Sequence, residues 1–402
     1  MNHEVSLVVG DPPMRIDTWD RYDLTIDMLQ PGSPWTASLW RSDTRDANWT
    51  RLRAVRLYDP VTWLIDGATV VSGRVETRRV EGKRTGALLV LSGRDASGPA
   101  LDWDADPTVR LRGLTLAAAL EALFAPLGIP VVIGASADGT RLVQVGTRRG
   151  PRGVTRSRRT RPIDIAHPRP GERVWQLADA IVRRAGYLLW IAPSEGGGLA
   201  VVVDTPGYGS GVRYRLERRA QPDAPGGGFV GNILSGAEDL NGRDAPSVVN
   251  VYTHATRGDA VSARQRATVA NAGLADAAIT RGLVRTPLPV HPRHVRADRA
   301  RTVAAAQREG ERVLANAMAR FRAYSCTVQG HGQPTTSAPN LFAVNTMAHV
   351  HDDLCLNPSG APLDEDMLVT RVAFSGGGRT EGQTTTLALG PRSAIVVTPE
   401  DG

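Results

Sequence analysis

The sequence contains a single lysine, Lys83, although lysine and arginine together number 48 among its 402 residues. The formal charge of +7 is therefore carried almost entirely by arginine. Two explanations for this bias stay open. Arginine codons are rich in G and C, so the bias is typical of a GC-rich genome. The planar guanidinium also suits bidentate pairing at subunit interfaces.

Cysteine is equally scarce, with only Cys326 and Cys355 in the chain. Two cysteines do not make a disulfide framework in a chain of this length, so we expect reduced thiols in a protein made in the cytoplasm. The N-terminus lacks the basic flank and apolar core of a signal peptide. No apolar run is long enough to span a bilayer. The sequence therefore predicts a soluble protein without a membrane segment or a classical export signal.

Aromatic residues make up only 5% of the chain, whereas it has 42 glycines and 27 prolines. This balance favours a turn-rich β protein over a helical bundle. The length allows a sizeable core and predicts two to four domains. The fold class that we expect is mainly β with an α+β insertion: two tube-type β-barrel domains, a small α+β domain and a helical segment.

Residues 1–103 are predicted to form the first β-barrel domain. Asp66-Gly67 is a tight-turn sequence between apolar segments. Strands are predicted at residues 5–9, 19–29, 68–75 and 87–92. The polar stretch 35–49 is predicted to be a loop. The strands of such a ribbon have unpaired edges, so they must close into a barrel or be covered by a partner.

Residues 104–210 change in character and are predicted to form the inserted α+β domain. The stretch 114–127 has apolar residues at helical spacing, with Thr115 placed as its N-cap. A short strand at 130–133 follows, and residues 172–185 predict a second helix. A hairpin over 187–203 completes this domain.

The remaining chain is predicted to return to β structure. Residues 211–258 and 323–402 are assigned to the second β-barrel domain, and 259–322 to an insertion of loop and long helix. That helix is predicted over 296–323, with arginines outward and Val303, Ala304, Val313, Leu314, Ala317 and Phe321 inward. It is interpreted either as a packed surface helix or as a subunit contact.

Several motifs, in order and spacing, resemble the Mu-like baseplate hub proteins of contractile phage tails. The first barrel carries SGRVE at 72–76 and LSGRDASGPALDW at 91–103. The series continues through LRGLTLAAALEALFAPLGIPVVI at 111–133 and PRPGERVWQLADAIVRRAGYLLWIAPSEGGGLAV at 168–201. Four strand motifs extend it to the end of the second barrel, at 328–333, 345–352, 367–374 and 386–391. The resemblance covers nearly the whole chain.

The resemblance implies a structural role without chemistry. A hub of this family forms a homotrimeric ring that joins the tail tube to the central spike, with two similar barrels per chain matching a sixfold tube. The implied partners are the central spike protein, the tail tube protein and the baseplate wedge proteins, with the tape-measure protein as a further candidate. The implied location is the virion tail baseplate, assembled in the host cytoplasm. No catalytic residue and no cofactor are predicted.

One group of residues has the composition of a metal site. His349, His351, Asp353 and Cys355 lie at alternate positions and would share one face of a strand. A structural metal there, or a metal-dependent hydrolase centred on the two histidines, is one alternative hypothesis. The other interpretation is a hydrogen-bonded strand face or a subunit interface, because any strand places alternate residues on the same side.

The arginine-rich stretch at 147–162 is the second candidate site. It could be a loop that docks a partner, through Arg148, Arg149, Arg152, Arg156, Arg158, Arg159 and Arg161. Clustered cations could also neutralise phosphates, which keeps a nucleic-acid-binding protein as an alternative function. However, the run contains no aromatic residue for base stacking. Nucleic acid is therefore the less favoured partner.

Motifs of the common enzyme classes are missing. The sequence has no GxSxG, HExxH, Walker loop or CxxC pair. Residues 226–231 satisfy GxGxxG, but a dinucleotide site needs a strand before that motif and a helix after it. Neither is predicted here, so we interpret the glycines as a flexible loop.

Overall fold

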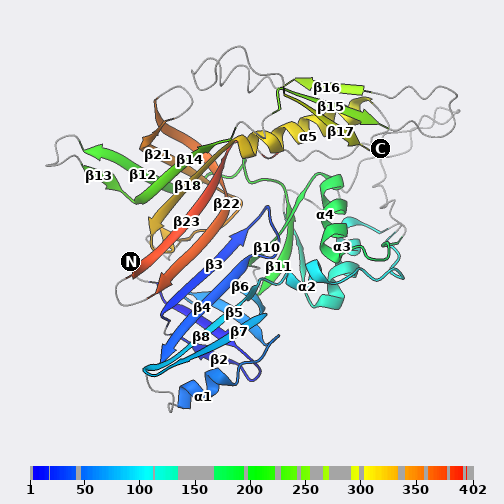
Figure 1. The fold of residues 1–402 in the computed structure, drawn as a ribbon. Coiled ribbons are helices and arrows are strands. Elements are labelled where there is room, and N and C mark those ends of the chain that lie inside the picture. Colours follow the sequence, from blue (N-terminus) through cyan, green and yellow to red (C-terminus); the bar gives the residue numbers. More distant parts are fainter. Residues whose placement is uncertain are drawn as a thin grey trace.

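The structure, a computed structural model, is mainly β with an α+β insertion, which confirms the predicted fold class (Figure 1). It describes residues 3–17, 19–41, 47–111, 114–134, 167–193, 198–221, 228–241, 246–253, 266–270, 291–297, 303–333, 340–356, 361–377, 381–392 and 395. Three hydrophobic cores are present in these residues, one of them shared by the N-terminal and C-terminal strands.

The N-terminal β region contains a four-stranded sheet, ordered β2-β1-β5-β6, and four strands of an 11-stranded sheet, in the order β3-β4-β8-β7. Its strands are β1 (Val5–Val9), β2 (Met14–Ile16), β3 (Arg21–Asp27), β4 (Pro34–Arg41), β5 (Pro60–Ile65), β6 (Ala68–Arg74), β7 (Thr77–Lys83) and β8 (Gly86–Arg94). An isolated bridge between Gly73 and Asp95 joins the two sheets. Asp66 and Gly67 both have positive φ, so the predicted turn between β5 and β6 is confirmed.

The predicted loop at 35–49 is wrong, because β4 begins at Pro34. Trp35, Ala37 and Leu39 point into the core, while the polar residues between them face outward. This is the period of two expected of a half-buried strand. The polar residues at alternate positions of this strand led to its interpretation as a loop. The short helix α1 (Ala47–Arg53) then leads to β5.

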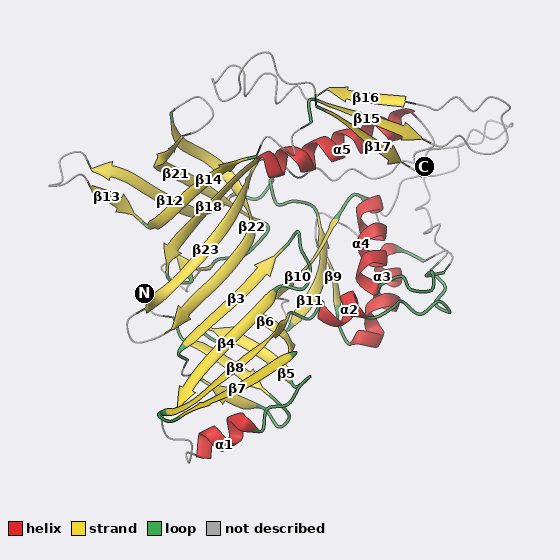
Figure 2. Cartoon of the chain, in the orientation of Figure 1, coloured by secondary structure: helices red, strands yellow, loops and turns green. Residues whose placement is uncertain are grey.

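The α+β insertion forms a core of its own. Its helices are α2 (Gly98–Asp102), α3 (Leu116–Phe124), the 3-10 turn η1 (Ala125–Leu127) and α4 (Val174–Ala185), and its strands are β9 (Val131–Ile133), β10 (Leu188–Pro193) and β11 (Leu199–Asp204). Thr115 is the N-cap of α3, as predicted, and its side chain accepts a bond from the amide of Ala118 at 3.2 Å. The helices gather on one side of the sheet (Figure 2).

The C-terminal β region contains β12 (Val212–Gln221), β13 (Gly228–Gly231), β14 (Ile233–Leu240), β18 (Arg322–Gln329), β21 (Thr346–Leu356), β22 (Pro362–Gly377) and β23 (Glu381–Pro391), with a small sheet of β19 (Gly332–Gln333) and β20 (Asn340–Leu341). Pairing runs from β12 through β21, β22, β23 and β18 to β14. Because β13 precedes β14 by one residue and pairs with β12, this path returns to its start.

The long strand β22 joins the two β regions. Its first half pairs with β21, its second half pairs with β3, and β23 follows its other edge. The resulting sheet continues from β13 to β7 in the order β13-β12-β21-β22-β3-β4-β8-β7. A hydrophobic core also runs through both regions.

A small unit of β15 (Val248–Thr253), β16 (Arg266–Ala270), β17 (Pro292–Ala297) and α5 (Val303–Phe321) has a separate core. The strand β15 pairs with β16 and β17 and so belongs to this unit. The predicted boundary at residue 258 assigned it to the second barrel instead. The helix is shorter than the predicted 296–323, and Val303 is exposed rather than inward. A Cβ on Gly310 would lie 2.7 Å from Val269 Cγ2, so this glycine permits the close packing of α5 on the sheet.

The GxGxxG stretch is not simply a loop. Gly228–Gly231 forms β13, which pairs antiparallel with β12, while residues 222–227 lie outside the described residues. The element that follows is a strand, β14, and not the helix that a dinucleotide site needs.

Candidate interaction surfaces

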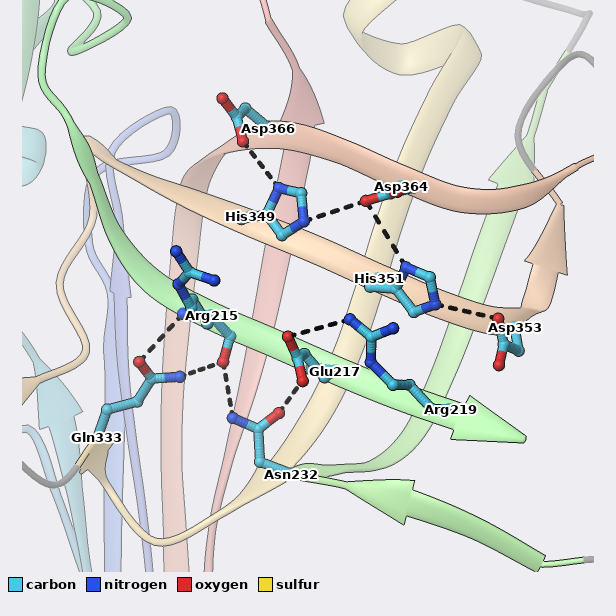
Figure 3. Close-up of polar contacts among 10 residues, drawn as sticks. All are labelled: Arg215, Glu217, Arg219, Asn232, Gln333, His349, His351, Asp353, Asp364 and Asp366. Atoms are coloured by element: carbon cyan, nitrogen blue, oxygen red, sulfur yellow. Dashed lines mark hydrogen bonds and ion pairs between the residues drawn. The ribbon is translucent and has the colours of Figure 1, made fainter. Parts of the chain in front are cut away.

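Two histidines and three carboxylates gather on one face of β21 and β22 (Figure 3). Pairing aligns His349 with Asp366, and His351 with Asp364. Asp353 lies two residues further along β21 and so faces the same way. We call these five residues the His–Asp face.

Each histidine of this face contacts two carboxylates. His349 Nδ1 lies 3.0 Å from Asp366 Oδ1, and its Nε2 lies 3.0 Å from Asp364 Oδ1. His351 Nε2 lies 3.1 Å from Asp353 Oδ1, and its Nδ1 lies 3.6 Å from Asp364 Oδ1. The carboxylate of Asp364 therefore lies between the two imidazoles, and it is 55% exposed.

Cys355 does not share this face, although the period of two predicts that it should. The pairing of β21 with β22 is irregular between Asp352 and Leu356, which ends the simple alternation. The Cys355 thiol instead packs against the core beside Asp352. Burial, and then the neighbouring Asp352 carboxylate, raise its pKa to about 11. Among the described residues, no group of three or more His, Cys, Asp or Glu side chains is arranged to hold a metal ion.

Side-chain amides brace the neighbouring strand β12 (Figure 3). The carbonyl of Arg215 accepts bonds from Gln333 Nε2 and from Asn232 Nδ2, the latter at 2.8 Å. The amides of Arg215 and Glu217 in turn donate to Gln333 Oε1 at 3.0 Å and to Asn232 Oδ1 at 2.8 Å. These bonds satisfy backbone groups that a further strand would otherwise pair.

A buried ion pair lies on the opposite side of the same strands. Arg218 donates to Asp352 at 2.8 and 2.6 Å, and the Tyr324 hydroxyl donates to Asp352 Oδ2 at 2.6 Å. Burial alone would raise the pKa of Asp352, but the bonds from Arg218, Tyr324 and the Leu354 amide outweigh it and lower that pKa. Gly236 leaves room for this cluster, since a Cβ there would lie 2.7 Å from Asp352 Oδ2.

A basic projection lies at the other end of the molecule, where α1 ends (Figure 1). Arg51, Arg53, Arg56, Leu57 and Tyr58 are all exposed. We call these five residues the α1 tip. No salt bridge joins its three arginines to a carboxylate within the described part of the chain.

Several described strands pair on one side only, and two of them end the sheet path. The strands β7 and β13 lie at the two ends of the sheet path, and each pairs on one side only. Val80 on β7 and Phe229 and Val230 on β13 are exposed. The α1 tip adjoins β7 through a bond from Arg78 Nη2 to the Arg53 carbonyl at 2.8 Å. The His–Asp face adjoins the β12–β13 hairpin through a bond from the Ala220 amide to Asp353 Oδ2 at 2.6 Å.

The arginine-rich loop cannot be placed beside these surfaces. Residues Arg148, Arg149, Arg152, Arg156, Arg158, Arg159 and Arg161 all lie outside the described residues. Sequence reasoning missed Asp364 and Asp366, which alternate along the strand just before its apolar run. Only strand register brings them to the histidines.

Comparison with solved structures identifies the fold. The chain is similar to a 43 kDa tail protein of prophage MuSo2 from Shewanella oneidensis, at 18% identity and a TM-score of 0.71, covering 98% of this chain and 100% of that one. It is also similar to a tail protein from Neisseria meningitidis MC58, at 21% identity and a TM-score of 0.69, with full coverage of both chains.

A more distant likeness has the same character. Prophage tail protein gp18 from Listeria monocytogenes EGD-e aligns at 10% identity and a TM-score of 0.53, over 96% of this chain and 94% of that one. No protein-family model and no curated protein matches the chain. The fold is thus one found in tail proteins from three bacterial genera. Among the described helices, none is long and apolar enough to cross a membrane.

Proposed function

We propose that this protein is a structural component of a phage-type tail, and specifically a baseplate hub. The observation that carries the proposal is a fold shared over nearly the full length of this chain and of two tail proteins. A local likeness could reflect a common barrel, which many functions share. A likeness that includes both β regions and the α+β insertion supports a common architecture and a common role.

The proposed hub is a homotrimeric ring that joins the tail tube to the central spike. One face of the ring binds the tail tube protein and the other seats the spike. The baseplate wedge proteins, and as a further candidate the tape-measure protein, complete its partners. Its place is the virion baseplate, reached by assembly in the host cytoplasm. The role is mechanical, with no catalytic residue and no cofactor.

The sheet path supports assembly into a ring. It ends in two different open edges, β7 and β13, rather than in two copies of one edge. An exposed strand edge carries unpaired N–H and C=O groups, so another chain can pair with it. A contact between two different surfaces is repeated head to tail and gives a closed ring when the rotation allows it.

The test is the absolute mass of the purified protein by light scattering, alone and with the spike and tube proteins encoded beside it. We expect a trimer, or a monomer that becomes a three-to-three complex with the spike. A protein that stays monomeric with every one of these partners contradicts the hub.

The two alternative functions have tests of their own. Nucleic-acid binding through residues 148–161 predicts salt-sensitive retention on DNA that is abolished when that loop is neutralised. A metal-dependent hydrolase predicts stoichiometric zinc or iron in the purified protein. No contact among the described residues favours either one over the hub.

A further inference from the structure

The α1 tip and the His–Asp face are surfaces of opposite character that lie beside the two open ends of one sheet path. We propose that the α1 tip of one copy binds the His–Asp face of the next copy, and so forms the contact between subunits. This inference rests on the ring assembly proposed above, and it identifies the surfaces that build it.

The α1 tip has the composition of a binding surface. Tyrosine and arginine are the residues that most often dominate the energy of protein interfaces. Tyr58 is 69% exposed and is flanked by Leu57 and Arg56. Burial of its ring in a partner would recover the hydrophobic contribution that exposure forfeits.

Tyr58 also holds a backbone conformation that a non-glycine residue rarely adopts, with φ of 69°. Two bonds keep it there. Its amide donates to the Val75 carbonyl at 2.7 Å, and the Arg56 amide donates to Asp59 Oδ2 at 2.8 Å. This conformation costs free energy, and it leaves most of the Tyr58 side chain exposed. A partner that binds the ring would offset that cost.

The His–Asp face offers the complementary chemistry. Asp364 and Asp366 contact the histidines through Oδ1, which leaves Oδ2 of each as a further acceptor. A planar guanidinium fits such carboxylates better than an ammonium group does. The charged residues of the α1 tip are arginines, opposite in sign to the three carboxylates of the His–Asp face.

A second copy of the chain fits better than an unrelated acidic protein because both surfaces adjoin open edges. The edge strand β7 presents Val80, two residues beyond the Arg78 that contacts the α1 tip. The edge strand β13 presents Phe229 and Val230, and Phe229 pairs with Ala220, whose amide contacts Asp353. One surface thus combines apolar residues with arginines, and the other combines apolar residues with carboxylates. Two such surfaces are complementary, because apolar residues meet apolar residues and opposite charges meet each other. The contact is head to tail, because the two surfaces differ.

The experiment is a charge swap followed by mass measurement. Arg53→Glu with Arg56→Glu should weaken self-association by at least about tenfold, and so should Asp364→Arg with Asp366→Arg, since each change brings like charges together. The variant carrying all four substitutions should regain most of the wild-type association. Light scattering and sedimentation over a concentration series give the fold-change.

Matched controls separate a local effect from a change in net charge or in folding. Arg169→Glu and Glu121→Arg alter exposed residues of the α+β insertion, and both should leave the assembly unchanged. If Asp364→Arg with Asp366→Arg fails to fold, Asp364→Asn with Asp366→Asn replaces it and should weaken association in the same direction.

The outcomes distinguish this inference from the hub itself. A wild-type trimer that survives both charge reversals overturns the inference and leaves the hub standing. Charge reversals that break the assembly without rescue in the fourfold variant also overturn it, provided that variant is folded by circular dichroism. A wild-type protein that remains monomeric, with the spike and tube proteins present, overturns the hub as well.

Discussion

The two β regions share one core but fill their interiors differently. The N-terminal region is packed with large aromatic side chains, with Trp35 and Trp63 fully buried and the Trp19 ring 4.9 Å from that of Trp63. The C-terminal region also buries Tyr214, Tyr324 and Phe374, but it adds the buried ion pair of Arg218 and Asp352. Among the described residues, the two buried arginines, Arg218 and Arg322, both belong to it.

This difference concerns how each region defines its fold. Apolar side chains of similar volume replace one another at modest cost, so an aromatic core tolerates repacking. A buried ion pair is directional and strongly penalises loss of one partner. We therefore expect the Arg218–Asp352 pair to fix the positions of β12 and β21, the strands that support the His–Asp face. The N-terminal region should depend mainly on volume.

The largest expected effect is on the ion pair. Arg218→Ala should lower the free energy of unfolding by about 3–5 kcal/mol, because it leaves the Asp352 carboxylate buried without its counterion. The double variant Arg218→Met with Asp352→Leu should recover most of that loss. Urea unfolding at pH 7 measures both, and equal losses in the single and double variants would contradict this account.

A glycine tests how tightly the same cluster is packed. Gly236→Ala places a methyl group 2.5 Å from the Tyr324 hydroxyl and 2.7 Å from Asp352 Oδ2. We expect a loss of about 2 kcal/mol from the overpacking. Gly82→Ala on β7 is the matched control, since nothing lies within 4 Å of the added atom. Similar changes in stability for both variants would show that the cluster of Arg218, Tyr324 and Asp352 can accommodate the added methyl group.

The junction between the two β regions should be sensitive to pH. His331 is fully buried, its Nε2 lies 2.6 Å from the Tyr22 hydroxyl, and burial lowers its pKa to about 3. The unfolded chain binds a proton near pH 6.5, whereas the folded chain does not. The contribution is therefore fully present above pH 6.5 and is lost as the pH falls toward 3.

Between pH 7 and pH 5 this histidine should account for a loss of about 2 kcal/mol in the free energy of unfolding. Urea unfolding across that interval measures the slope. His331→Gln provides the comparison, because glutamine has no proton to gain. An unchanged slope in that variant would assign the pH dependence to other groups.

The smallest effect on stability is expected at the α1 tip. Tyr58→Gly removes the strain of a positive φ and should change the free energy of unfolding by less than about 1 kcal/mol, with the relief of strain offset by the greater freedom of the unfolded chain. Self-association should nevertheless weaken, since the exposed ring is lost. A folded variant that assembles as the wild type does would show that Tyr58 is not in the interface, whereas a variant that unfolds readily would contradict the small stability change.

Local patterns in the sequence predicted much of the fold. Residues 5–9 coincide with β1, and the Asp66-Gly67 turn and the Thr115 cap lie where they were predicted. These features depend on neighbouring residues alone, which is why sequence reasoning finds them. The resemblance to Mu-like hubs, carried by the same patterns, agrees with the fold found by structural comparison.

The candidate surfaces could not be predicted in the same way. The histidines were singled out, but Asp364 and Asp366 join them only through the register of β21 with β22. Cys355 was assigned to the same face because strict alternation along a strand predicts it there. The irregular pairing that ends this alternation cannot be recognised from the sequence. The α1 tip was missed because a loop residue with positive φ is not evident from sequence unless it is glycine.

The strand β22 has a consequence for how the molecule bears load. Its 16 residues run without interruption from the C-terminal region into the N-terminal one, where six of them pair with β3. A pull that separates the two regions along this strand must shear several hydrogen bonds at once, whereas a flexible linker would simply extend. The backbone of β22 thus connects the two β regions directly and resists their separation.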